Sequence, residues 1–350
     1  MLLVKIMNKY YIQHEGKVIE ANDQFKHVMA ITLNPKKDYK EGIVRCIISR
    51  EGDVQVKGYT DRSELFKISS DSLEQFKIGE RLNIKNKKEI IDQLVEPDWE
   101  FIGLEDPDIY IDEKNDLMHV YFTIPIKYKD KSKKIKIHLG HAVGKDLDSL
   151  EMTMPVLLDI GNMSAKEVSI VPINKNGFRY NLIESRDKQG EATYSVVQVA
   201  IVKDMDKDWE YGNIVFHPRE HNIPWIGGHA SPGPLFPKSF IDVGEGKLLG
   251  VINGREANQK MSDGSTKYGM FSIGLFIYDY EIGKIDWISP EPFIQDSEAI
   301  TITFASQFVE TSKGGGVLYA HVDDSFVRAY DLKVDEVKQF LKYNNYEIKN

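Results

Sequence analysis

The sequence predicts an all-β fold, a five-bladed β-propeller with a short C-terminal helix, on three observations. Segments of four to nine residues rich in Val, Ile, Tyr and Phe alternate with turns such as EKND, NKNG, GEGK and KGGG. One phrase, an apolar strand followed by an aspartate and an acidic or aromatic tail, returns five times. Helical spacing of apolar residues is confined to residues 87–96 and 333–344.

The repeated phrase divides the chain into units of similar length. It appears as LFKISSDSLEQF, GHAVGKDLDSLE, VAIVKDMDKDWE, LFIYDYEIGKIDW and RAYDLKVDEVKQF. Its aspartates lie 52 to 75 residues apart, which suits one four-stranded sheet for each repeat. Two stacked β-sandwiches are the alternative architecture. The five aspartates are Asp71, Asp146, Asp204, Asp279 and Asp331.

We expect residues 1–350 to form a single domain with the blades in chain order. An N-terminal extension, residues 1–24, precedes the first blade and could support self-association or close the propeller. Within a blade, a tight turn joins two strands, as EKND does between DPDIYI and LMHVYF. The blades are expected approximately at residues 25–96, 97–154, 155–215, 216–291 and 292–342.

Composition excludes several classes of protein. The net charge is −9 and the one lysine-rich run, residues 127–137, is interpreted as a solvated hairpin tip, so nucleic acid is not an expected partner. The single cysteine, Cys46, rules out an intramolecular disulfide and fits a reducing compartment. No apolar run reaches 18 residues, so no membrane contact is expected, and we predict a cytoplasmic protein. The nine histidines lack metal-ligand spacing, so neither a metal nor a cofactor is expected.

The stretch FIGLEDPDIYID concentrates carboxylates beside a proline. Pro107 cannot donate to a β-ladder, so it belongs at the start of a strand or at a sheet edge. At the start of the second blade's inner strand it would hold Asp106 at the mouth of the propeller. Carboxylates gathered there raise one another's pKa, and a neutral carboxyl can act as a general acid. The alternative is that these acids only solvate a turn.

GLEDPDIYIDEKNDLMHVYFT resembles the Glu-Asp-Pro-Arg signature of glycoside hydrolase family 130, the β-mannoside phosphorylases and related hydrolases. Four further stretches resemble motifs of the family's first, third, fourth and last blades, in the right order, and the resemblance covers residues 30–342. They are LNPKKDYKEGIVRCIIS, SAKEVSIVPINKNGFRYNLIES, DKDWEYGNIVFHPREHNIPWIGGHASPGPLFP and VLYAHVDDSFVRAY. The resemblance implies inverting transfer of a β-mannosyl unit, with Asp106 as the acid acting through a substrate hydroxyl. Phosphate or water is the nucleophile, and Asp323 matches a sugar-contacting aspartate.

The chain departs from this family where phosphate would bind. The arginines and the lysine that such a site requires align near His138, near Glu184 and Ser185, and near Trp225. The Tyr-His pair aligns near Ile252 and Asn253, and Asp108 replaces the arginine of the signature. These departures favour water, and therefore a hydrolase, over a phosphorylase.

A hydrolase needs a base for its water. Glu184 is the first candidate, followed by Glu167 and Glu256. His229 lies in the tight loop WIGGHASPGP, in which Trp225 could stack on a sugar. Arg255 could pair with a sugar-bound carboxylate or solvate its loop. The substrate-binding candidates are Glu105, Arg45, Asn34, Lys166, Glu167, His229, Arg255, Glu256 and Asp323.

Four functions remain open from the sequence. The first is a glycoside hydrolase, and the second is a β-mannoside phosphorylase. The third is a glycosidase of the related five-bladed families that act on arabinans, xylans or fructans, which use two aspartates and a glutamate from different blades. The fourth is a catalytically inactive propeller that binds carbohydrate. The expected partner is an oligosaccharide substrate, and a homo-oligomer is possible.

Overall fold

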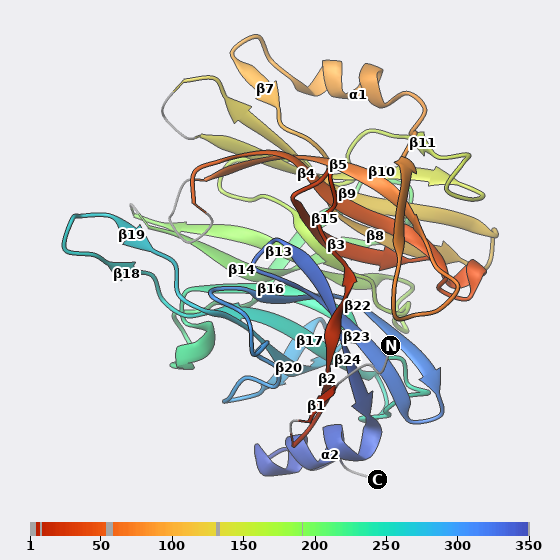
Figure 1. Ribbon diagram of the computed structural model, residues 1–350, viewed down its shortest axis with the longest axis vertical. Helices are drawn as coiled ribbons and strands as arrows, with labels where there is room; N and C mark the ends of the chain where they lie inside the picture. The colour runs from red at the N-terminus through yellow and green to blue at the C-terminus, as the bar shows by residue number, and fades with distance from the viewer. Residues whose placement is uncertain (1–4, 8, 54–58, 131–133, 191, 349–350) are drawn as a thin grey trace.

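The computed structural model describes residues 5–7, 9–53, 59–130, 134–190 and 192–348. The N-terminal extension predicted at residues 1–24 therefore lies partly outside the described residues. The regular secondary structure of the described chain is almost entirely β, which confirms the predicted all-β class (Figure 1). Its two α-helices are α1 (Lys87–Leu94) and α2 (Val334–Tyr343), within the two stretches predicted to be helical. With 8 and 10 residues, neither is long enough to cross a membrane.

Twenty strands form five antiparallel groups of four, which we call units 1 to 5 in chain order. Unit 1 consists of β3 (His27–Leu33), β4 (Glu41–Glu51), β5 (Thr60–Ser69) and β6 (Lys77–Arg81). Unit 2 consists of β8 (Glu105–Asp112), β9 (Leu117–Tyr128), β10 (Ile135–Gly144) and β11 (Glu151–Met152), and β7 (Trp99–Phe101) pairs with the far end of β9.

Units 3 and 4 repeat this order. Unit 3 consists of β12 (Lys166–Ser169), β13 (Arg179–Gln189), β14 (Ala192–Val202) and β15 (Glu210–Phe216). Unit 4 consists of β16 (His229–Leu235), β17 (Lys247–Arg255), β20 (Phe271–Asp279) and β21 (Lys284–Ile288). A hairpin of β18 (Gln259–Lys260) and β19 (Thr266–Lys267) projects from the body of the molecule (Figure 1). The short 3-10 turns are η1 (Pro35–Lys37) and η2 (Pro224–Ile226).

Unit 5 takes strands from both ends of the described chain. Its strands β22 (Thr303–Ser312), β23 (Gly315–Val322) and β24 (Phe326–Lys333) are extended by β2 (Ile12–Ile19), with β1 (Lys5–Met7) outside it. The fully buried Arg328 fixes this junction. Its Nη1 donates to the carbonyls of His14 and Glu15, at 3.0 and 3.2 Å, and its Nε lies 2.9 Å from Oδ2 of Asp296.

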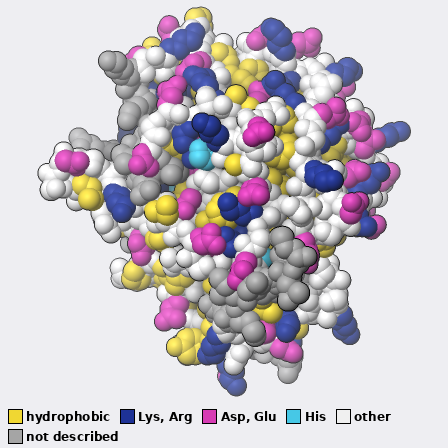
Figure 2. Space-filling model, in the orientation of Figure 1, with side chains coloured by type: hydrophobic (Ala, Val, Ile, Leu, Met, Phe, Trp, Pro, Cys, Tyr) yellow, Lys and Arg dark blue, Asp and Glu magenta, His cyan; other side chains and the backbone are white. Residues whose placement is uncertain are grey.

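The apolar core consists mainly of five clusters, each shared by successive units. The series is cyclic, because unit 5 shares one cluster with unit 1. Each cluster contains residues of both units: Ile43 and Phe122 for units 1 and 2, Leu139 and Ile183 for 2 and 3, Val197 and Ile252 for 3 and 4, Leu249 and Leu318 for 4 and 5, Tyr319 and Val44 for 5 and 1. The units therefore hold together by burying apolar surface against their neighbours. Charges of both signs are interspersed on the outside (Figure 2).

Candidate active site

A cavity of about 1250 Å³ collects side chains from all five units. Unit 2 contributes Glu105 and Asp106, and unit 3 contributes Lys166, Glu167 and Glu184. Arg45 enters from unit 1, and His229 and Arg255 enter from unit 4. Eight of the eleven residues predicted from the sequence thus line one cavity, although they are separated by up to 210 positions in the chain.

Each unit has a register shift in its first strand pair, and in units 2 and 3 this β-bulge explains how two consecutive residues both reach the cavity. In a regular strand neighbouring side chains point to opposite faces, whereas a bulge re-aims one of them. Asp106 and Glu167 have left-handed backbone, with φ of 48° and 50°. Glu105 and Lys166 therefore line the cavity together with the residues that follow them. The register shifts lie between Met29 and Ile31, Glu105 and Asp108, Lys166 and Val168, Pro232 and Leu235, and Ala305 and Gln307.

Arg45 is the anchor of the acids from unit 2. Its Nη2 donates to Oε1 of Glu105 at 2.6 Å and its Nη1 to Oδ1 of Asp106 at 2.8 Å. Its Nε donates to Oγ of Ser63 at 2.9 Å, so the guanidinium is held in one orientation. Burial raises the pKa of Glu105 to about 7, with Arg45 opposing this rise and the charge of Asp106 adding to it.

The pKa values of Glu167 and Glu184 are shifted in opposite directions. Burial, and then the negative charge of Asp106, raise the pKa of Glu167 well above its usual range. Burial also raises the pKa of Glu184, but His229 and Lys166 outweigh it and bring that pKa down to about 2. The pKa values of these two carboxyl groups are therefore shifted in opposite directions, one toward the protonated acid and one toward the carboxylate, as acid–base catalysis needs.

The contacts of Glu184 explain its charge. Oε1 lies 3.4 Å from Nζ of Lys166, which is its cross-strand partner, and Oε2 lies 3.1 Å from Nε2 of His229. Burial lowers the pKa of His229 itself, so its ring is neutral at neutral pH. The ring packs edge-on against Phe271, with 4.9 Å between centroids.

Asp324, to which the sequence assigned no role, also lines the cavity. The hydroxyl of Tyr59 donates to its Oδ2 at 3.1 Å, and Nε2 of His321 lies 3.1 Å from its Oδ1. Burial raises its pKa, but His321 and nearby arginines lower it to about 2. In regular backbone, two adjacent acids after a strand cannot both point the same way. The doublet Asp323–Asp324 could therefore have indicated from the sequence that Asp324, as well as Asp323, was a candidate for the site.

Three predicted residues do not line the cavity. Asn34 caps η1, with its Oδ1 accepting from the N–H of Lys36 at 3.0 Å. Glu256 lies on the outside, where its Oε2 accepts from the N–H of Met270 at 3.4 Å. Asp323 accepts from the N–H groups of residues 300, 301 and 302 at 2.8, 2.8 and 2.9 Å, which makes it the cap of a loop at the cavity mouth.

Trp225 also lies elsewhere than predicted. It is buried in the apolar cluster between units 3 and 4, and its Nε1 donates to the carbonyl of Ser289 at 3.1 Å. It therefore cannot stack on a sugar. His138, where the family resemblance leads to an arginine, is buried beside the cavity, with its Nδ1 accepting from the N–H of Asp159 at 2.9 Å. Arg186 pairs with the same Asp159.

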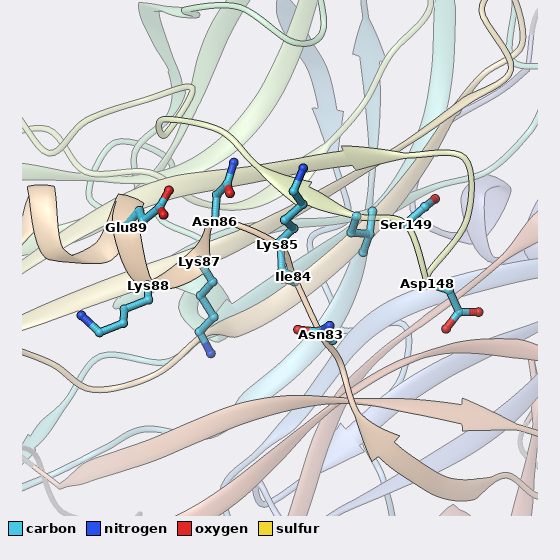
Figure 3. Close-up of a pocket in the computed structure, with 10 residues that line it drawn as sticks. Asn83, Ile84, Lys85, Asn86, Lys87, Lys88, Glu89, Asp148 and Ser149 are labelled. Atoms are coloured by element: carbon cyan, nitrogen blue, oxygen red, sulfur yellow. The ribbon is translucent and has the colours of Figure 1, made fainter.

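Two other hollows carry no comparable set of groups. One, of about 520 Å³, lies between the start of α1 and the loop before β11 (Figure 3). Lys85 and Asn86 point away from Lys87 and Lys88 there, and all three lysines are paired with acids. The other, of about 1200 Å³, is lined from all five units, with Tyr39 from unit 1, by residues that do not include the carboxyls described above. Within the described chain, no cluster of His, Cys, Asp and Glu could hold a metal ion.

Comparison with protein-family models finds no match, and comparison with curated proteins finds none either. Solved structures do match. A protein from Bacteroides thetaiotaomicron, provisionally described as a glycosidase, has a TM-score of 0.64 and 16% identity, over 93% of this chain and 97% of the other. The β-1,2-mannobiose phosphorylase of Listeria innocua has a TM-score of 0.58 and 16% identity, over 97% and 91%.

A third structure comes from work on the glycoside hydrolases of family GH130 that target β-1,2 mannosidic linkages in Candida mannan. Its TM-score is 0.61 at 16% identity, and the match covers 90% of this chain and 86% of the other. At such identity the likeness establishes the fold. The chain thus shares its fold with mannoside phosphorylases and hydrolases of family GH130, which agrees with the resemblance around Asp106 and with a divergent sequence.

Proposed function

We propose that the chain is an inverting glycoside hydrolase that acts on β-mannosides or related oligosaccharides. The observation that carries the proposal is the meeting of Glu167, Glu184 and Asp106 in one cavity, where the pKa of Glu167 is raised and that of Glu184 is lowered. An inverting hydrolase requires one protonated carboxyl and one ionised carboxylate on either side of the scissile bond. The shared fold with carbohydrate-active enzymes supports the same reading.

In this mechanism Glu184 is the base. It takes a proton from a water molecule, whose oxygen attacks the anomeric carbon as the bond from that carbon to the leaving oxygen breaks. The leaving oxygen receives a proton from Asp106 and Glu167, which act as one donor pair. Asp106 delivers the proton through a substrate hydroxyl, and Glu167 holds it in the resting site, because the negative charge of Asp106 favours the protonated form of its neighbour.

Water is favoured over phosphate as the nucleophile because two cations of the cavity, Arg45 and Lys166, are paired with acids. Arg45 is bound to Glu105 and Asp106, and Lys166 lies against Glu184. A phosphate dianion needs several unpaired donors on the nucleophile side. His138 and Arg186, which lie near positions where the family resemblance leads to arginines, do not line the cavity.

The glycosidase classes that use two aspartates and a glutamate receive less support. The bulge that presents Asp106 in unit 2 and Glu167 in unit 3 presents Ala30 in unit 1, with the same left-handed backbone at φ 49°. At the position of unit 1 that matches Asp106 and Glu167, the chain therefore has a residue without a carboxyl group.

We also propose that the five units are the blades of a closed five-bladed propeller. Two observations support closure. The apolar clusters form a cyclic series that returns from unit 5 to unit 1. The strand β2, near the N-terminus, completes the sheet of unit 5 beside β24.

The test is the release of sugar from β-linked manno-oligosaccharides, with and without inorganic phosphate. We expect free mannose that does not depend on phosphate, first formed as the α-anomer. Glu167→Gln, Glu184→Gln and Asp106→Asn should each lower kcat by about 10²-fold or more, since general acid–base catalysis contributes about 10²–10⁴. Glu256→Gln, outside the cavity, is the matched control. A mannose 1-phosphate product would reject water as the nucleophile, and full activity in the first two variants would reject Glu167 and Glu184 as the proton donor and the base.

A further inference from the structure

Arg255 is a cation in the cavity wall without a carboxylate partner. No carboxylate oxygen of the described residues lies within ion-pair distance of it, and its Nε is buried without a hydrogen-bond partner. Its guanidinium lies 4.3 Å from the ring centroid of Tyr268 and 5.2 Å from that of Phe271. The end of β17 and the pairing of Arg255 with His229 on β16 fix its position beside the catalytic carboxyls.

The energetic state of Arg255 points to a missing partner. Burial lowers its pKa, and the opposing effects of Tyr268, Glu184 and Tyr59 do not restore it. The one carboxylate among them, Glu184, is already engaged by His229 and Lys166. A partly desolvated cation without a counter-charge costs free energy, and an anionic group on a ligand would recover it.

The surroundings select the kind of anion. Among the other cations of the wall, Arg45 and Lys166 face acids, Lys127 donates to Oγ1 of Thr60 at 3.2 Å, and Arg219 lies exposed over Tyr194. A phosphate dianion beside the acids of this cavity would require more than one unpaired guanidinium. A single planar guanidinium between two aromatic rings matches one planar carboxylate of charge −1, which it can bind with two parallel hydrogen bonds.

We propose that the substrate is an acidic glycoside, in which a sugar carboxylate binds Arg255 between Tyr268 and Phe271. This inference rests on the proposed function, because it names the substrate class of the same cavity. Arg255 is then a specificity-determining residue: it distinguishes a hexuronide from the corresponding neutral hexoside, while Glu167, Asp106 and Glu184 carry out the bond cleavage.

The test compares three ligands with the same ring by titration calorimetry at pH 7: methyl β-D-mannopyranosiduronate, its methyl ester, and methyl β-D-mannopyranoside. The acid should bind the wild-type protein at least tenfold more tightly than either neutral ligand. In Arg255→Gln this preference should fall to within twofold, and Arg255→Lys should retain part of it. Arg81→Gln, an exposed arginine that pairs with Glu64 on the outer strand of unit 1, should keep the full preference.

Equal binding of the acid and its ester by the wild-type protein would overturn the proposal without any variant. Arg255-dependent binding of inorganic phosphate, without binding of the acid, would overturn the assignment of a carboxylate. The two proposals fail separately. A carboxylate preference that depends on Arg255 in a protein that cleaves no glycoside would reject only the hydrolase, and cleavage of neutral and acidic glycosides at equal rates would reject only the acidic substrate.

Discussion

At the scale of single residues, the cavity depends on which neighbour each carboxyl has. Lys166 and Glu167 are adjacent in sequence but act in opposite ways. Lys166 helps to lower the pKa of Glu184, whereas burial and the charge of Asp106 raise the pKa of Glu167. Motif reasoning placed all four residues in the site. It could not predict which of their pKa values are raised and which are lowered, because these shifts depend on burial and on distances that residue types do not encode.

His229 provides a pH-dependent test of this division. Glu184 has a pKa of about 2 because His229 and Lys166 outweigh the effect of burial. In His229→Gln one of these two influences is lost, so the pKa of Glu184 should rise and the base should become protonated at a higher pH. The acidic limb of the profile of kcat against pH should therefore move to higher pH than in the wild type.

The control for this prediction is His221→Gln, an exposed histidine that packs on Phe216 outside the cavity. Its pH profile should match that of the wild type. An acidic limb that stays in place in His229→Gln would mean that Glu184 does not act as the base.

At the scale of elements, the repeated aspartate phrase is informative because it marks the same strand in every unit. Asp71, Asp146 and Asp204 follow β5, β10 and β14, Asp279 ends β20, and Asp331 lies in β24. These are the third strands of units 1 to 5. Hydrophobic periodicity and turn residues therefore predicted strand order well, whereas the bulges at Asp106 and Glu167 leave no trace in residue type.

The two aspartates of the turn after β23 have different roles: Asp323 caps a loop, and Asp324 lines the cavity. Asp323 holds three N–H groups of the loop at residues 300–302, so Asp323→Ala leaves these donors without their acceptor. We expect a loss of about 1–3 kcal/mol in the free energy of unfolding, the usual cost of an unsatisfied polar group, measured by urea denaturation.

Asp324→Asn is the partner variant for this turn. Because Asp324 faces the cavity, this variant should raise KM, whereas Asp323→Ala should leave KM unchanged. The opposite pattern, with KM raised by Asp323→Ala at full stability, would restore Asp323 as the residue that contacts sugar.

At the scale of the whole molecule, the junction in unit 5 holds strands from opposite ends of the chain. Arg328→Met removes the donor to the carbonyls of His14 and Glu15 and leaves the buried Asp296 without its cation. Breaking one side of a buried ion pair costs about 3–5 kcal/mol, so urea denaturation should show a loss of this size.

The double variant Arg328→Met with Asp296→Asn should recover part of that loss, because the uncompensated charge is gone. Arg81→Met, at an exposed pair, should cost less than about 1 kcal/mol. A small effect of Arg328→Met would mean that β2 is held chiefly by its backbone pairing with β24.

The pairing of β2 with β24 also sets an order of events on the ribosome. About 310 residues separate the end of β2 from the start of β24. At a translation rate of about 5–20 residues per second, β24 is therefore synthesised roughly 15–60 s after β2. During that time units 1 to 4 can form from contacts that are already available. Unit 5 is completed last, and until then β2, which pairs with β1 on one side, has an open edge that a chaperone or a second nascent chain can occupy.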